Sequence, residues 1–164
     1  MKKTNKTRYA VYDEADWEKV YFDEQTKGFV VIHKGHGKGE RVGNFAIAKR
    51  LANLGFMVEL LPISAGKSVD SCINEEFWEF KMTSGSMSSV QSRLREGKFQ
   101  CEKILLVPSP TFQIGELLRG VISAVNVDKA RQIQEVGLLI ENEFIRLLRG
   151  EILKRDFTKL EHYF

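Results

Sequence analysis

Short apolar runs on either side of one amphipathic stretch dominate the first half of the chain. Residues 29–33 and 56–61 are apolar runs of strand length, the second closed by Pro62. Between them, residues 40–54 carry apolar side chains at helical spacing, and Gly55 is a residue type that ends helices. Residues 70–81 then predict two short strands around a turn at residues 74–76.

The second half predicts two helices, a buried strand and one segment with two interpretations. Helices are expected at about 90–96 and at 112–125, with an apolar strand at 104–107 between them. Residues 134–140 and 143–148 predict a second hairpin around Glu141 and Asn142. A continuous helix is the alternative there, because Gln, Glu, Leu and Arg are good helix formers.

Together these elements predict one α+β domain. Residues 1–27 are polar with interspersed aromatics and are expected to form an arm packed on the domain. Residues 28–148 would form the domain itself, and residues 149–164 a charged C-terminal tail.

Composition narrows the class of protein. The 164 residues are 43% hydrophobic and 29% charged, which is typical of a folded domain rather than a disordered chain. No run approaches the roughly 18 apolar residues that span a bilayer, and the charged N-terminus has no apolar segment behind it, so no signal peptide is predicted. Cys72 and Cys101 form neither a metal motif nor a disulfide framework. We therefore expect a cytoplasmic protein.

The hairpin region carries the most specific chemistry. Glu79 and Lys81 are two residues apart on a predicted strand, so they share one face, and the hairpin can bring Asp70 beside them. Carboxylates can bind a metal or move a proton, and a lysine can stabilise charge on a phosphate. The alternative is a solvated hairpin face with an ordinary Glu–Lys pair.

A basic, glycine-rich stretch precedes the hairpin. Lys34, Lys38, Arg41 and Lys49 can follow a phosphate backbone, and His36 in the loop is a candidate general acid or base. A solvated loop and helix face is the alternative.

Three further side chains have two interpretations each. Trp78 is either a core residue or a platform for stacking a base. Thr83 and Ser84 either hydrogen-bond a phosphate or cap the following helix.

These residues carry a family resemblance that spans about residues 28–143. The chain resembles the C-terminal tRNase domains of contact-dependent growth inhibition toxins, which belong to the barnase, EndoU, colicin and RelE-like fold class. The matching positions are His33-Lys34-Gly35-His36, Glu40, the helix ending at Gly55, Val58 to Pro62, Asp70, Trp78-Glu79-Phe80-Lys81 and Gln100. The resemblance implies N-terminal helices packed on a central antiparallel sheet. It also implies metal-independent cleavage of RNA, typically tRNA, and active-site positions at His36, Glu40, Asp70, Trp78, Glu79 and Lys81, with Thr83 or Ser84 nearby.

The expected reaction is attack by the ribose 2′-OH, giving a 2′,3′-cyclic phosphate and a 5′-OH. His36 or Glu79 would take the 2′-OH proton, the other group or Asp70 would protonate the leaving oxygen, and Lys81 would stabilise the phosphorane. A toxin of this kind would need an immunity partner. A copy carried on a mobile element and acting inside the cell is an equal expectation.

Two alternatives belong to other classes. Asp70 with Glu79-x-Lys81 also fits the restriction-endonuclease-like pattern, in which Asp70 and Glu79 hold Mg²⁺ in a mixed α/β fold that cleaves DNA. The other alternative is a non-catalytic nucleic-acid-binding domain, which would show salt-sensitive binding without turnover.

Overall fold

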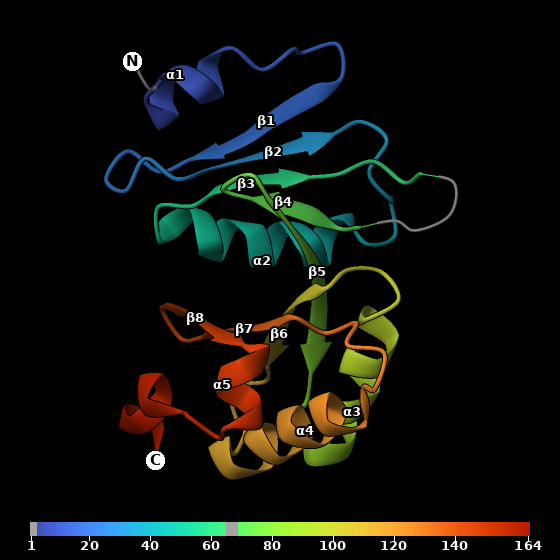
Figure 1. Cartoon of the computed structure of the whole chain (residues 1–164). Helices are drawn as coiled ribbons and strands as arrows, with labels where there is room; N and C mark the ends of the chain where they lie inside the picture. Colours follow the sequence, from blue (N-terminus) through green and yellow to red (C-terminus); the bar gives the residue numbers. More distant parts are fainter. Residues whose placement is uncertain (1–2, 65–68) are drawn as a thin grey trace. The chain divides into compact units, whose positions relative to one another are not determined.

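The structure is a computed structural model that describes residues 3–64 and 69–164. The chain divides into two compact units, unit 1 up to Phe77 and unit 2 from Trp78 onward. Figure 1 labels the helices and strands of both units.

Unit 1 is a small mixed sheet with a helix on each face. Its elements are α1 (Asn5–Ala10), β1 (Trp17–Phe22), β2 (Phe29–His33), α2 (Arg41–Asn53), β3 (Met57–Leu60) and β4 (Ser71–Ile73). Strands β1 and β2 pair antiparallel, β2 and β3 parallel, and β3 and β4 antiparallel. The parallel β2–β3 pair follows from the connection through α2, which crosses from one end of the sheet to the other.

Side-chain alternation assigns the two faces of the unit 1 sheet. Val30 lies opposite Val58 in the β2–β3 register, and both are buried on the face that α2 covers. Phe29 points to the other face, where its ring meets that of Tyr9 from α1 at a centroid distance of 5.2 Å. Figure 1 shows α1 and α2 on either side of this sheet.

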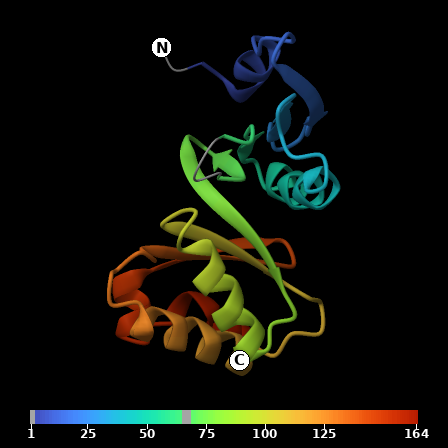
Figure 2. The same cartoon turned by 90° about the vertical axis from the view of Figure 1, so that its right-hand side faces the viewer.

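Unit 2 has a larger apolar core. Strand β5 (Glu76–Thr83) starts just before the boundary and is followed by α3 (Met87–Gly97), β6 (Lys103–Pro108), α4 (Ile114–Val127), β7 (Glu135–Ile140), β8 (Glu143–Leu148), α5 (Arg149–Leu153) and the 3₁₀ helix η1 (Thr158–Tyr163). Strands β5, β6 and β7 run parallel, and β7 and β8 form an antiparallel hairpin. Figure 2 shows α3 and α4 side by side against the sheet.

The predicted α+β class is confirmed, and so is the second hairpin, which rules out the helical alternative for residues 134–148. The sheets are not purely antiparallel, because β2–β3, β5–β6 and β6–β7 are parallel pairs. A mixed sheet is what the restriction-endonuclease-like alternative predicts.

The predicted division into arm, domain and tail differs from the observed one. Residues 1–27 include β1, which is a paired strand of the unit 1 sheet rather than an arm. Residues 149–164 are not a tail, because Ile152 and Leu160 are fully buried in the unit 2 core. Charged residues dominate this segment, so its two buried apolar residues formed no pattern from which a packed segment could be predicted. In the described parts of the chain, the structure contains no helix long and apolar enough to cross a membrane.

Candidate functional site

The structure distributes the predicted site residues over both units. Unit 1 holds His36, Glu40 and Asp70 and the four basic residues Lys34, Lys38, Arg41 and Lys49. Unit 2 holds Trp78, Glu79, Lys81, Thr83 and Ser84.

In unit 1, a hydrogen-bond network joins His36 to Asp70 through Asn44. His36 Nδ1 lies 2.6 Å from the backbone oxygen of Leu61, and the Asn44 amide nitrogen lies 3.2 Å from His36 Nε2. The same amide donates to Asp70 Oδ1 at 3.5 Å. The tight turn of the glycine-rich loop, where the His36 N–H bonds the carbonyl of His33, aims the imidazole back at the sheet.

Both ring nitrogens of His36 have protein partners. A carbonyl oxygen can only accept, so Nδ1 donates to Leu61, and Nε2 faces the amide of Asn44. The side chain is 6% exposed. The expectation that His36 is the general acid or base stays a prediction, and a substrate would have to displace Asn44 or Leu61 to reach a ring nitrogen.

Sequence reasoning missed Asn44. Its one signal is its place in the first turn of α2, close in sequence to the loop that carries His36. Its amide nitrogen lies within hydrogen-bond distance of both His36 Nε2 and Asp70 Oδ1, so Asn44 links the two side chains.

The basic residues around α2 are not equivalent. Lys34, Lys38 and Lys49 are exposed. Arg41 instead donates to both carboxylate oxygens of Glu18, at 2.7 and 3.4 Å, and this hydrogen bond and charge hold the pKa of Glu18 below its usual range. Lys34 and Lys38 are thus exposed cations, Lys49 lies 5.1 Å from the centroid of the Tyr21 ring, and Arg41 is paired with Glu18.

Glu40 stands at the start of α2 and is exposed. Its carboxylate turns back over the glycine-rich loop, because Oε2 would lie only 3.3 Å from a Cβ at Gly37. A side chain in place of Gly37 would therefore crowd Glu40, which gives this glycine a steric role beside its turn.

In unit 2, Glu79 and Lys81 share a face of β5 as the alternation predicts. In the parallel register Glu79 lies beside Ile104 and Lys81 beside Leu106, both buried residues of β6. Glu79 is only 4% exposed, whereas Lys81 is half-buried. Burying a carboxylate is costly, so its retention in a strand beside apolar neighbours calls for a compensating role.

Trp78 belongs to the core. It is 1% exposed, its ring meets Phe144 at 5.3 Å in an edge-to-face contact, and the Arg146 guanidinium lies 5.2 Å from the ring centroid. A ring packed in this way has no face for a base, so the stacking interpretation is corrected to the core interpretation.

Thr83 and Ser84 order the loop before α3. The Thr83 hydroxyl accepts from the N–H of Gly85 and lies 2.7 Å from the hydroxyl of Ser89. Ser84 donates to Ser86, whose own hydroxyl accepts from the N–H of Ser89 as the N-cap of α3. Neither side chain caps α3, because its N-cap is Ser86, and Thr83 and Ser84 order the loop in front of that cap.

Among residues 3–64 and 69–164, no group of three or more His, Cys, Asp or Glu side chains is arranged to hold a metal ion.

Neither a protein-family model nor a curated protein matches this chain. Among solved structures, a chain of the CdiA-CT/CdiI toxin and immunity complex from Burkholderia pseudomallei is similar, at 12% sequence identity and a TM-score of 0.49. The similarity covers 80% of this chain and 96% of that one.

Proposed function

We propose that this protein is a nuclease that cleaves RNA, with Glu79 and Lys81 as its catalytic residues. The observation that carries the proposal is the pair itself: a carboxylate that is 4% exposed lies two residues from a half-buried lysine on the same face of β5. A buried carboxylate and an adjacent ammonium supply a proton acceptor and a positive charge, the two groups that phosphodiester cleavage requires.

In this mechanism the 2′-OH is the nucleophile. The Glu79 carboxylate takes its proton, the O2′–P bond forms, and the P–O5′ bond breaks to leave a 2′,3′-cyclic phosphate. Lys81 stabilises the negative charge that builds on the non-bridging oxygens. Since both nitrogens of His36 are occupied, it does not compete for the base role. Solvent water supplies the proton that the leaving 5′ oxygen takes up.

The substrate and biological role follow from the family resemblance. A tRNA is the proposed target, and Lys34, Lys38 and Lys49 are the exposed cations that would contact its backbone. A toxin of this class requires an immunity protein, which would be acidic to cover such a surface. The same activity carried on a mobile element would act in the cell that makes it.

A metal-dependent nuclease is the second candidate, and the mixed sheet favours it. Glu79 lies on β5, which runs parallel to β6, as the restriction-endonuclease-like alternative predicts. In unit 2, Glu79 would supply an oxygen ligand of the kind that Mg²⁺ prefers, and the ion would supply the activation of a water. The chain's own contribution would still be Lys81, placed to stabilise the phosphate.

Cleavage assays separate the candidates. Purified protein is incubated with total tRNA and with DNA, each with EDTA or with Mg²⁺. RNA cut in EDTA with 2′,3′-cyclic ends supports the proposal. Cleavage that requires Mg²⁺ and leaves 5′-phosphates supports the second candidate instead. No cleavage of either substrate by folded protein contradicts both and favours a binding domain.

Variants assign the residues. Glu79→Gln and Lys81→Met are each expected to lower the rate by roughly 10² or more, as loss of a proton-transfer or charge-stabilising group does. Exposed residues of the same unit provide matched controls, Glu102→Gln and Lys129→Met, which should leave the rate unchanged. Asp70→Asn tests the sequence-predicted acid. Wild-type rates in both Glu79→Gln and Lys81→Met would remove them from the mechanism.

A further inference from the structure

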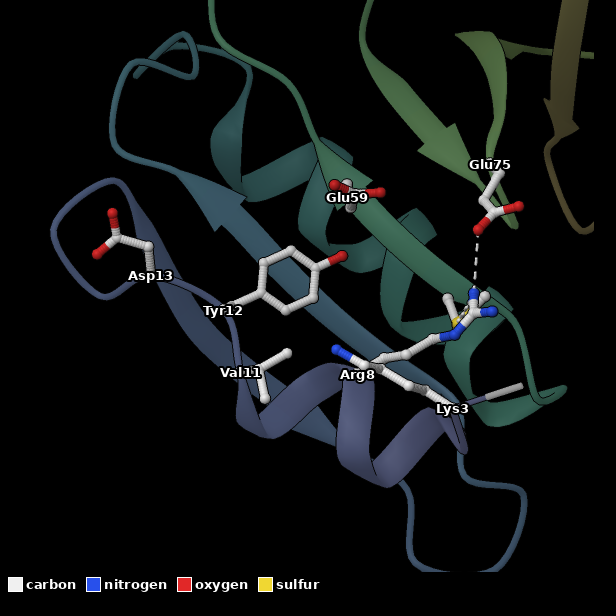
Figure 3. A pocket seen from close by; sticks show the side chains of 8 residues that line it. Lys3, Arg8, Val11, Tyr12, Asp13, Glu59 and Glu75 are labelled. Atoms are coloured by element: carbon white, nitrogen blue, oxygen red, sulfur yellow. Dashed lines mark hydrogen bonds and ion pairs between the residues drawn. The ribbon is translucent and has the colours of Figure 1, made fainter. Parts of the chain in front are cut away.

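Unit 1 contains a pocket of about 620 Å³ that the proposed chemistry does not use. It lies on the sheet face that carries α1. Its walls come from α1, the segment after it, β3 and the turn after β4, and include Arg8, Val11, Tyr12, Met57, Glu59 and Glu75. Figure 3 shows these side chains around it. The volume suits a ligand of nucleoside size.

A half-buried carboxylate forms the polar wall. Glu59 projects from β3 opposite Cys72 of β4. In Figure 3 the Tyr12 hydroxyl points toward Glu59. A carboxylate has about four acceptor positions, so Glu59 can accept two hydrogen bonds from a ligand.

A guanidinium and a fixed aromatic ring complete the pocket. Arg8 pairs with Glu75 at 3.1 Å, but the Glu75 side chain is 76% exposed, and exposed pairs contribute little stability. Arg8 can therefore exchange this partner for a ligand. The Tyr12 ring is held by edge contacts with Trp17 and Phe29, at 5.5 and 5.8 Å, which makes it a rigid wall.

We propose that this pocket binds a guanine base. Guanine presents adjacent N1–H and N2–H donors on one edge, which match the Glu59 carboxylate, and O6 and N7 acceptors on another, which match the Arg8 guanidinium. Adenine lacks the paired donors, and the pyrimidines offer fewer acceptors to a guanidinium. A role of this pocket in recognising RNA would deepen the proposed nuclease function and rests on it. Guanine binding by itself does not depend on that function.

Titration of the full-length protein tests this binding directly. GMP, AMP, CMP and UMP are titrated by calorimetry, together with a U-rich heptamer containing one central G and an all-U heptamer. Selective binding of GMP, or of the G-containing heptamer over all-U, supports the inference, and the two arms distinguish a free nucleotide from a base in RNA. Equal affinities for all four nucleotides with no heptamer preference, or no binding at all, overturn it.

Variants tie any selectivity to the pocket. Glu59→Gln is expected to weaken guanine binding by about tenfold, because it replaces one of the two charged carboxylate oxygens with an amide nitrogen that cannot accept. Tyr12→Phe keeps the ring and loses only the hydroxyl, so the guanine preference should persist. Glu24→Gln is the matched control, an exposed carboxylate elsewhere in unit 1. Wild-type selectivity in a folded Glu59→Gln protein overturns the assignment. Guanine binding without cleavage would contradict the proposed function alone, and cleavage without guanine selectivity would contradict this inference alone.

Discussion

Arg149 donates to Asp128 Oδ2 at 2.8 Å in the interior of unit 2. The same guanidinium bonds the backbone oxygens of Ile133 and Asp128, at 2.8 and 3.0 Å. Asp128 in turn accepts from the backbone N–H groups of Gln132 and Ile133. This pair thus ties the first residue of α5 to the connection between α4 and β7, and it explains why the C-terminal segment is part of the fold.

Removing one partner of this pair should be costly. Asp128→Ala leaves the Arg149 charge buried without its carboxylate, and such changes typically destabilise by about 3–5 kcal/mol. Urea denaturation should show a free energy of unfolding lower by that amount and a correspondingly lower midpoint. Glu161→Ala, an exposed acid in η1, is the control and should shift stability by less than about 0.5 kcal/mol. An unchanged midpoint in Asp128→Ala would contradict the role given to the pair.

The same residue predicts how stability depends on acid. Burial opposes ionisation of Asp128, but hydrogen bonds from the Ile133 and Gln132 amides and from Arg149 outweigh it, so its pKa lies below the usual value. A carboxylate whose pKa is lower when folded stabilises the protein above the unfolded pKa of about 3.9, and this contribution is lost as pH falls through the lower folded value. Asp128→Asn should therefore flatten the loss of stability below about pH 4. Parallel acid limbs for the two proteins would contradict it.

Local patterns predicted most of the fold, because each element carries its own signal. The turn after β4 is an example: Asn74 and Glu75 both adopt positive φ, the conformation that a two-residue hairpin turn requires. Signals that depend on distant partners could not be read in the same way. The burial of Leu160, the parallel strand pairs and the occupied nitrogens of His36 are all set by contacts far away in the sequence. The candidate site was predictable to the same degree, since alternation placed Glu79 with Lys81 but gave no hint of Asn44.

Asn44 offers a test of the unit 1 network. Asn44→Leu removes the donor to His36 Nε2 and to Asp70, leaving a half-satisfied polar cluster at a cost of about 1–3 kcal/mol. Nitrogen NMR of the imidazole should report the Nδ1–H tautomer in both proteins, because Leu61 still accepts from Nδ1, and the Nε2 resonance should shift in the variant, which loses its Asn44 partner. Asn53→Leu, at the end of the same helix, is the control for the imidazole signal. Identical His36 spectra in wild type and Asn44→Leu would contradict the network.

The contact between α3 and α4 depends on a missing side chain. A Cβ at Gly120 would lie 2.6 Å from Val90 Cβ and 2.8 Å from the backbone oxygen of Met87, distances that a helix backbone cannot relieve without moving. Gly120→Ala should destabilise unit 2 by about 1–3 kcal/mol, despite the better helix propensity of alanine. Gly115→Ala is the matched change in α4, where nothing lies within 4 Å of the added Cβ, and it should be neutral or stabilising by up to about 1 kcal/mol. Equal melting-temperature shifts for the two variants would show that packing does not decide the effect.

The pH dependence of guanosine binding distinguishes Glu59 from its neighbours. Burial raises the pKa of Glu59, and the negative charge of Glu75 adds to this rise, while hydrogen bonds from Tyr12 and Cys72 partly offset it. Burial also raises the pKa of Tyr12, and that of Cys72 to about 11, so both groups stay neutral through the acid range.

The other charged side chains that line the pocket are the basic Lys3 and Arg8 and the exposed acids Asp13 and Glu75. Binding needs the ionised Glu59 carboxylate, so affinity should fall as pH is lowered, beginning above the ordinary glutamate value of about 4.3. Guanosine is the titrant because it carries no phosphate that titrates in this range. Glu59→Gln should abolish this acid limb along with the affinity gain at neutral pH. An acid limb that persists in Glu59→Gln would assign it to Asp13 or Glu75 and remove Glu59 from the site.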